Sequence, residues 1–350
     1  MNKNRIGRCD RDLFISYFTI DGLSQQFTSS YISNKFSVNL KITKLDHCNR
    51  KQNFEQIILD LKKYIPRLLI MNCVYKLSSP IVTSFGIQIK KMFSNITKPL
   101  EGKVAIITAS TDGIGFAAAK QLVSDGASIM ISSRKKNNVE IALEQLQKQY
   151  GANKVKGLVC HVSKKEDRTN LIQETIKIFG GIDILVSNAA TNPTSGSVLD
   201  CDEEIWDKIF DVNVKSAFLL TKEIAPHLIS RGGGSIVYVS SIAGVNPMPM
   251  LGAYSVSKTA LLGLTKVVAM DLAENNIRVN CVAPGIIKTK FASALTENES
   301  LSEHLLQEIP IKRFGRPEEI GSVISFLCSP SSSFITGEVI VASGGMKSRL

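Results

Sequence analysis

Short apolar runs rich in β-branched residues recur along the chain from about residue 102 onward. Each run is continuous in hydrophobicity and is followed by a segment of helix length; the first two helices are predicted over residues 117–124 and 139–149. The runs are residues 104–107, 127–131, 155–159, 182–186, 235–239, 277–282 and 339–341. Such strands, alternating with helices, are typical of a parallel sheet covered on both faces. The pattern predicts one α/β domain over residues 99–350, a doubly wound, seven-stranded parallel sheet flanked by helices.

Residues 1–98 do not join this pattern. They are rich in Asn, Lys, Ser and Ile and have no glycine punctuation that matches a strand–helix–strand unit. Three interpretations stay open: a disordered or loosely folded extension, a targeting segment, or a chain whose natural start is Met71 or Met92. The first two rest on composition, and the third on the closeness of Met92 to the first strand.

The formal net charge of +11 belongs to the same segment. Residues 1–98 hold sixteen Lys and Arg against six Asp and Glu, a balance of +10, so the remaining 26 basic and 25 acidic residues leave +1. The predicted domain therefore has no excess of basic residues with which to bind a polyanion. The predicted domain is therefore not expected to bind nucleic acid.

The seven cysteines are scattered and form no Cys-x-x-Cys pair. This spacing predicts neither a disulfide framework nor a metal site and is typical of a reducing compartment. Cys160 and Cys281 fall in apolar, strand-like runs, where we expect buried and inert thiols. No apolar run approaches eighteen residues, so we predict no membrane span.

A glycine-containing loop follows the first predicted strand directly and precedes the first predicted helix. Its sequence is Thr108-Ala109-Ser110-Thr111-Asp112-Gly113-Ile114-Gly115. A turn of this kind lets backbone N–H groups approach a pyrophosphate at a helix N-terminus. The spacing is not Gly-x-Gly-x-x-Gly, and a glycine pair alone is usually only a turn. Its place between strand and helix predicts a dinucleotide site.

The end of the second strand indicates which dinucleotide is bound. Folds that prefer NAD carry an acidic residue there, which binds the ribose 2′-hydroxyl. This chain has Ser132-Ser133-Arg134-Lys135-Lys136 instead. A guanidinium beside hydroxyls suits a 2′-phosphate, although basic residues after a strand are commonly just solvated. We expect NADPH/NADP+ rather than NADH/NAD+.

Tyr254 and Lys258 are four residues apart, and Ser241 lies thirteen residues before Tyr254. A spacing of four places the phenol and the ammonium on one helix face. A lysine beside a tyrosine favours the phenolate, so we expect it to lower a phenol pKa that is ordinarily about 10. Proton transfer by such a phenol is what carbonyl–alcohol redox chemistry needs. Alone, the pair is more often a solvated helix face, and Ser241 a capping hydroxyl.

Taken together, these motifs resemble the classical short-chain dehydrogenase/reductase family over about residues 99–345. The landmarks occur in the family's order: the glycine loop, Ser187-Asn188-Ala189-Ala190, Asn213, Ser241, Tyr254, Lys258, Pro284-Gly285 and Thr289. The resemblance implies a Rossmann-type domain with Tyr254 as general acid, Ser241 polarising the substrate carbonyl, and Lys258 binding the nicotinamide ribose. It also implies that Asn213 holds a water in a proton relay.

The resemblance further implies a set of binding residues. Those for the cofactor are Thr108, Ser110, Thr111, Gly113, Ile114, Gly115, Ser133, Arg134, Lys135, His161, Val162, Asn188, Ala189, Tyr254, Lys258, Pro284, Gly285, Ile287 and Thr289. Those for the substrate are Ser241, Val245, Met248, Met250, Leu251 and Tyr254, with residues 291–307 as a lid. Ala109, Ser187, Ala190 and His161 depart from the family's usual Gly, Asn, Gly and Asp.

The same variants resemble one subgroup, the peroxisomal NADP(H)-dependent carbonyl and retinal reductases. The resemblance implies reduction of retinal, aromatic ketones or α-dicarbonyls by a homotetramer or dimer. An NADP+-linked alcohol or retinol dehydrogenase and a non-catalytic NADP(H)-binding protein are the alternatives. Ser348-Arg349-Leu350 is a close variant of the peroxisomal tripeptide and is expected to bind the import receptor. Cytoplasm and mitochondrion are the alternative locations.

Overall fold

The computed structural model of the chain describes residues 98–348. The three interpretations of the N-terminal segment fall on residues outside this range. Arg349 and Leu350 of the terminal tripeptide lie outside it as well. Within it, no helix is long and apolar enough to cross a membrane.

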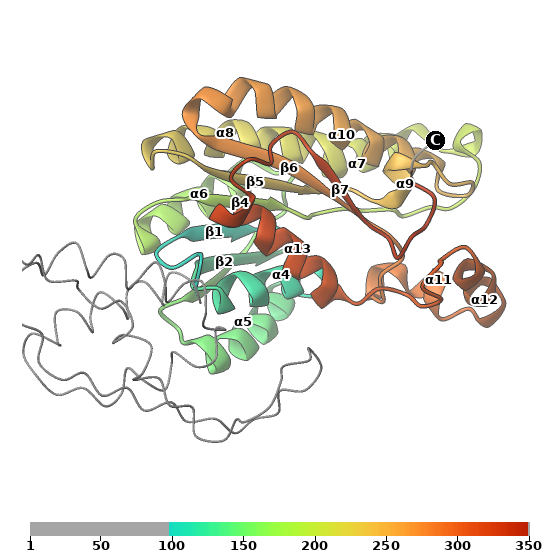
Figure 1. Cartoon of the computed structure of the whole chain (residues 1–350), viewed down its shortest axis with the longest axis horizontal. Coiled ribbons are helices and arrows are strands. Elements are labelled where there is room, and N and C mark those ends of the chain that lie inside the picture. The colour runs from blue at the N-terminus through green and yellow to red at the C-terminus, as the bar shows by residue number, and fades with distance from the viewer. Residues whose placement is uncertain (1–97, 349–350) are drawn as a thin grey trace, which may run out of the picture. The chain divides into compact units, whose positions relative to one another are not determined.

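A seven-stranded sheet, parallel throughout, forms the centre of this part of the chain (Figure 1). Its strands are β1 (Val104–Ile107), β2 (Ser128–Ser133), β3 (Val155–Val159), β4 (Ile184–Ser187), β5 (Gly234–Val239), β6 (Ile277–Pro284) and β7 (Val339–Ala342). The strand order is β3-β2-β1-β4-β5-β6-β7. Successive strands are added toward one edge of the sheet from β1 to β3 and toward the other edge from β4 to β7, so the order switches between β1 and β4. Ligands of doubly wound folds bind at such a switch point, outside the carboxyl ends of the strands. The predicted fold class is confirmed.

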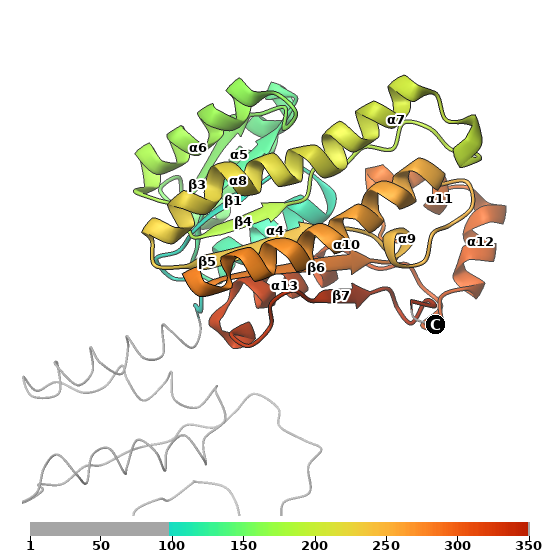
Figure 2. The same ribbon diagram turned by 90° about the horizontal axis from the view of Figure 1, so that it is seen from above.

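Helices cover both faces of the sheet (Figure 2). One face carries α4 (Gly113–Ser124), α5 (Lys136–Tyr150) and α13 (Pro317–Cys328), and the other carries α6 (Lys165–Phe179), α8 (Ser216–Ser230) and α10 (Gly252–Leu272). The shorter helices are α7 (Glu203–Phe210), α9 (Ile242–Val245), α11 (Ser293–Thr296) and α12 (Glu299–Gln307). A π-helical turn, η4 (Asp211–Lys215), joins α7 to α8.

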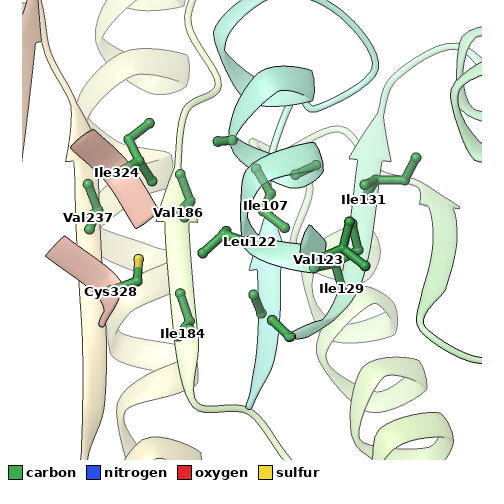
Figure 3. Packing of buried hydrophobic residues seen from close by; sticks show 14 of the residues in the cluster. Ile107, Leu122, Val123, Ile129, Ile131, Ile184, Val186, Val237, Ile324 and Cys328 are labelled. Carbon is green, nitrogen blue, oxygen red and sulfur yellow. The ribbon is translucent and has the colours of Figure 1, made fainter. Parts of the chain in front are cut away.

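Fully buried aliphatic side chains hold α4 and α13 against the sheet (Figure 3). Leu122 from α4 and Ile324 from α13 lie over Ile107 and Val186 of the two central strands. Burying each such side chain stabilises the fold by about 1.5–3 kcal/mol. This packing fixes where α4 begins, and therefore where the glycine loop lies.

The predicted element boundaries differ from the observed ones by a few residues. The first helix begins at Gly113 rather than residue 117, because Asp112 caps it by accepting a hydrogen bond from the Gly113 N–H. The fourth strand begins at Ile184 rather than residue 182. An apolar run marks which side chains are buried, whereas backbone hydrogen bonding decides where an element starts.

The prediction of buried thiols is confirmed. Cys160 and Cys281 are both buried in the core on the α6, α8 and α10 side of the sheet. Burial raises the pKa of Cys160 to about 12 and that of Cys281 to about 11. Both therefore stay protonated and unreactive at neutral pH.

Candidate active site

Ser241, Tyr254 and Lys258 come together where β5 ends and α10 begins. Ser241 follows β5 and caps α9, where its hydroxyl accepts from the Ala243 N–H at 3.1 Å. Ser241 therefore has the capping role that the sequence left open, and its role in catalysis stays a prediction. α9 packs closely on α10, because a Cβ at Gly244 would lie 2.7 Å from the backbone carbonyl carbon of Lys258. The absence of that Cβ lets Ser241 reach Tyr254.

Lys258 is buried and anchored to the sheet. Its side chain is 2% exposed, and its Nζ donates to the Val239 carbonyl at 2.7 Å. The same nitrogen lies 5.6 Å from the centroid of the Tyr254 ring, within range of a cation–π interaction. Burial lowers the pKa of Lys258 to about 8, because the charged form is desolvated.

Burial also raises the pKa of Tyr254 to about 12, and a hydrogen bond with Ser241 lowers it only in part. The prediction that Lys258 lowers this pKa below its ordinary value is therefore wrong for the protein by itself. The phenol is 8% exposed, so removing its phenolate from water outweighs the attraction of an ammonium that is itself desolvated. Tyr254 is protonated at neutral pH.

Asn213 braces the loop that follows β4. Its Oδ1 accepts from the Thr191 N–H at 2.8 Å, and its Nδ2 donates to the Thr191 carbonyl and to Ser257 Oγ, each at 3.0 Å. Ser257 in turn donates to the carbonyl of Tyr254 at 2.7 Å. Both amide hydrogens of Asn213 are therefore used within the protein, and its role with a water stays a prediction.

The glycine loop is held by the residues that follow β4. The Thr108 hydroxyl accepts from the N–H groups of Asn188 and Ala189 at 3.0 and 3.1 Å. The Asn188 amide donates to the carbonyls of Thr108 and Ala109 at 3.1 and 3.0 Å. Ala109 has a left-handed φ of 48°, the conformation that the family's usual glycine adopts without strain. Asn188 thus holds a strained turn in place, and its contact with a cofactor stays a prediction.

Ser110 is committed to the protein backbone. It is fully buried, donates to the Ile107 carbonyl at 2.7 Å and accepts from the Ser132 N–H at 3.0 Å. Its hydroxyl therefore ties the glycine loop to the end of β2. Because the Ser110 hydroxyl is used within the protein, only its backbone could make the predicted contact with a cofactor. The neighbouring Thr111 is partly exposed.

The start of α4 has the shape of a phosphate cradle. A Cβ at Gly115 would lie 2.4 Å from the Ala109 carbonyl oxygen and 2.5 Å from Asn188 Nδ2, so only glycine fits there. Gly113 has a left-handed φ of 56°. Ile114 packs against the core and orients the helix. A strand, a tight turn and a helix N-terminus in this order fit a dinucleotide pyrophosphate.

The residues predicted for the adenosine half lie at the ends of β2 and β3. Ser133 is partly exposed, and Arg134 and Lys135 are exposed. Among residues 98–348 no carboxylate pairs with Arg134, whereas the neighbouring Lys136 pairs with Glu140.

After β3, Val162 is buried and His161 Nδ1 is a buried atom with no hydrogen-bond partner in the described part of the chain. The backbone N–H of His161 donates to Asp167 Oδ2 at 2.8 Å, and this hydrogen bond holds the turn. An unpartnered buried nitrogen beside an exposed guanidinium fits a ligand with hydrogen-bonding groups and negative charge.

The predicted nicotinamide side is formed by the turn after β6. Pro284 ends the strand, and the Gly285 N–H donates to the Ala342 carbonyl at 3.0 Å. The Ile287 side chain is buried in the core, so any contact it makes with a ligand comes from its backbone. The Thr289 hydroxyl accepts from the Ala292 N–H at 3.2 Å.

The structure divides the predicted substrate residues into two groups. Val245 and Met248 pack against a cluster formed by Ile242, Ile286, Leu305, Ile309, Phe314 and Met346. Met250 instead points into solvent, with a left-handed φ of 69°, and its carbonyl accepts from the Gly196 N–H at 2.9 Å. Leu251 pairs with the same glycine. The turn at Met250 therefore separates Met250 and Leu251 from Val245 and Met248, and the contact of these four residues with a substrate stays a prediction.

Sequence reasoning missed the residues that brace this site. Thr191 and Ser257 support Asn213, and the Val239 carbonyl anchors Lys258. Each contact joins segments far apart in the chain, and two of the partner atoms belong to the backbone. No residue pattern signals them, although Ser257 lies inside the Tyr-x-x-x-Lys motif.

Comparison with known proteins gives the family. A family model described as enoyl-(acyl carrier protein) reductase matches residues 108–347. Dehydrogenase/reductase SDR family member 4 of Oryctolagus cuniculus is 54% identical over 259 residues, which cover 73% of this chain and 99% of the relative. The chain belongs to the short-chain dehydrogenase/reductase family, whose members use a nicotinamide cofactor, and it is an oxidoreductase.

Two further relatives show how wide the family is. Tropinone reductase-like 3 of Erythroxylum coca is 49% identical over 261 residues, covering 75% of this chain and 98% of the relative. A solved structure of 7 alpha-hydroxysteroid dehydrogenase, in complex with NADH and 7-oxo glycochenodeoxycholic acid, is 32% identical. It superposes with a TM-score of 0.69 over 73% of this chain and 99% of its own. The family thus includes enzymes of different named substrates.

Proposed function

We propose that this protein reduces aldehyde and ketone carbonyls to alcohols with NADPH. One observation carries the proposal: the Ser241 hydroxyl and a protonated, buried Tyr254 meet beside Lys258, at the end of the sheet that carries the glycine loop. The bound nicotinamide would supply the hydride. The protein would orient the carbonyl and supply the proton.

In this proposal Ser241 and Tyr254 both donate hydrogen bonds to the substrate oxygen. The proton passes from the Tyr254 hydroxyl to that oxygen as negative charge develops on it. The Lys258 ammonium, 5.6 Å from the ring centroid, then stabilises the phenolate that forms. A phenol with a pKa of about 12 is protonated at neutral pH and can therefore donate this proton.

Replacement of Tyr254 by Phe tests the mechanism. Turnover should fall by at least about a hundredfold, in the range found for loss of a general acid, while NADPH binding is kept. Tyr238→Phe is the matched control, because this buried tyrosine on β5 pairs with Thr221 at 2.6 Å. If Tyr254→Phe keeps full reductase activity, the mechanism is wrong. If the wild-type protein binds NADPH and reduces no carbonyl, the non-catalytic alternative holds.

The preference for NADPH rests on Arg134. A charge-assisted hydrogen bond between its guanidinium and a 2′-phosphate contributes about 1.5–3 kcal/mol, so Arg134→Ala should raise the KM for NADPH roughly tenfold to a hundredfold. The KM for NADH should change little. Lys136→Ala is the control, because Lys136 already pairs with Glu140. Equal effects of both substitutions on both cofactors would argue against Arg134 as the selective residue.

The substrates we propose are lipophilic: retinal, aromatic ketones and α-dicarbonyls. The apolar cluster that includes Val245 and Met248, next to Ser241, supports this class. Rates of NADPH oxidation with a panel of these compounds, and with small polar aldehydes for comparison, test it. Higher kcat/KM for the polar aldehydes would contradict it.

We further propose that the enzyme is a homotetramer or dimer. Val256, Val267 and Met270 are exposed apolar residues at spacings of eleven and three on α10, which places them on one helix face. Light scattering after size exclusion should give a mass of two or four chains. Val267→Lys should lower that mass, whereas Phe334→Lys, another exposed apolar site, should not.

We also propose that Ser348-Arg349-Leu350 directs the protein to peroxisomes through the import receptor. A fluorescent protein fused to the N-terminus should colocalise with a peroxisomal marker. Deletion of Leu350 should release it to the cytoplasm. Mitochondrial fluorescence in both cases would support the alternative location.

A further inference from the structure

A short turn after β6 connects the glycine loop with the catalytic tyrosine. The turn η6 (Lys290–Ala292) is capped by Thr289, whose methyl group lies against Gly113: a Cβ built there would be 3.1 Å from Thr289 Cγ2. Lys290 Nζ pairs with Asp112 Oδ2 at 2.8 Å. Two contacts therefore join η6 to the start of α4, and they set where the next side chain, that of Phe291, is placed.

Phe291 lies against the ring of Tyr254. The two ring centroids are 6.0 Å apart and the rings are tilted by 41°, within the range of favourable aromatic pairs. Tyr254 is almost fully buried, whereas Phe291 is 57% exposed. One side of the Phe291 ring thus covers the catalytic phenol, and much of its surface is free to contact another group.

The position of this free aromatic surface limits what it can contact. A carbonyl oxygen bonded to Tyr254 and Ser241 has its carbon and substituents within a few ångströms of the phenol, and therefore near Phe291. Close to Ser241 in the chain, Val245 and Met248 pack against an apolar cluster that includes Ile242. A flat, unsaturated substituent gains the most from such surroundings, because aromatic faces attract one another beyond simple burial.

We propose that Phe291 is a specificity-determining residue, whose ring packs against an aryl or conjugated substituent of the carbonyl substrate. This inference rests on the proposed reductase function and adds the residue that selects the substrate. The Thr289 contact and the exposed Lys290–Asp112 pair join η6, which carries the ring, to the start of α4.

A matched pair of substrates tests the inference. 1-Phenyl-1,2-propanedione and 2,3-butanedione share a dicarbonyl and differ by a phenyl group in place of a methyl. Phe291→Leu keeps an apolar side chain and removes the flat ring. With NADPH as cofactor, Phe291→Leu should lower kcat/KM for 1-phenyl-1,2-propanedione about tenfold, which corresponds to the loss of one favourable aromatic contact. The kcat/KM for 2,3-butanedione should change less than about twofold.

Two controls separate this role from a structural one. Phe334→Leu replaces a fully exposed phenylalanine that precedes β7 at the amino end of the sheet. It should leave kcat/KM for both substrates unchanged. The Kd for NADPH, measured by fluorescence titration, should be unchanged in Phe291→Leu. A similar loss for both substrates, or no loss for either, would overturn the inference.

A binding measurement keeps the inference testable if the protein reduces neither compound, an outcome that would count against the proposed function itself. Calorimetric titration of the NADP+-loaded protein with 1-phenyl-1,2-propanedione needs no turnover. A Kd about tenfold higher for Phe291→Leu than for the wild type would support the aromatic contact. An unchanged Kd would refute it.

Discussion

Gly244→Ala should lower catalysis while the protein stays folded. The added Cβ would lie 2.7 Å from the carbonyl carbon and 2.8 Å from the carbonyl oxygen of Lys258, and 2.8 Å from Ser240 Oγ. Two of these three atoms belong to the backbone of α10, so no side-chain rotation relieves the contact. Because ordinary contact begins at about 3.4 Å, α9 and α10 must separate by about 0.7 Å.

That displacement changes the position of Ser241 relative to Tyr254, since Ser241 caps α9 and Tyr254 lies on α10. A misplacement of about 1 Å can lower a rate by about a hundredfold, so a shift of about 0.7 Å should lower kcat roughly tenfold or more. Overpacking of a close helix contact destabilises a protein by about 1–3 kcal/mol. The variant should therefore stay folded at room temperature.

The assay combines NADPH-linked kinetics with urea unfolding. Gly263→Ala is the control, because a Cβ at this position on α10 meets no atom within 4 Å. It should keep full activity and gain about 0.5–1 kcal/mol from higher helix propensity, with its oligomeric state checked by light scattering. A Gly244→Ala variant that keeps wild-type kcat would refute the argument that this contact positions Ser241.

Four further predictions concern stability. Burial lowers the pKa of Lys258 to about 8 from an ordinary value near 10.5, so between these pH values the folded state binds fewer protons than the unfolded state. The free energy of unfolding from urea titrations, relative to that of Lys258→Met, should therefore rise from pH 8 to pH 10.5. Tyr254 should have the opposite effect, because its pKa is raised on folding. Above pH 10 the free energy of unfolding, relative to that of Tyr254→Phe, should fall. Asp183→Ala should cost about 2–3 kcal/mol in the same measurement, because it leaves the Val104 N–H buried without its acceptor and breaks an ion pair with Arg231; a cost under 0.5 kcal/mol would contradict this. Ala109→Gly should stabilise the protein by about 0.5 kcal/mol by relieving a left-handed φ, and a lower melting temperature would count against strain at this position.

The candidate triad of Ser241, Tyr254 and Lys258 could be found in the sequence because its proposed chemistry depends on side-chain type and on spacing along the chain. The direction of the Tyr254 pKa could not, since it depends on how much water reaches the phenol. Spacing places an ammonium beside a phenol, but only the packed structure shows that both groups are buried and that desolvation is the larger effect.

A similar division applies to the substrate side. The residues from Val245 to Leu251 form one apolar stretch in the sequence, yet the turn at Met250 sends its two halves to different neighbours. Phe291 is one of fifteen phenylalanines in the sequence, and only the folded chain brings its ring against that of Tyr254.

The sequence by itself determined the parallel sheet, the position of the glycine loop and the three catalytic side chains. These features depend on local hydrophobic pattern and on spacing within single elements, which a linear chain displays directly. Tertiary structure alone decided which carbonyl anchors Lys258, how closely α9 approaches α10, and which aromatic ring covers Tyr254. Each of these is a contact between distant segments, and its free energy depends on burial and on distances that no single segment contains.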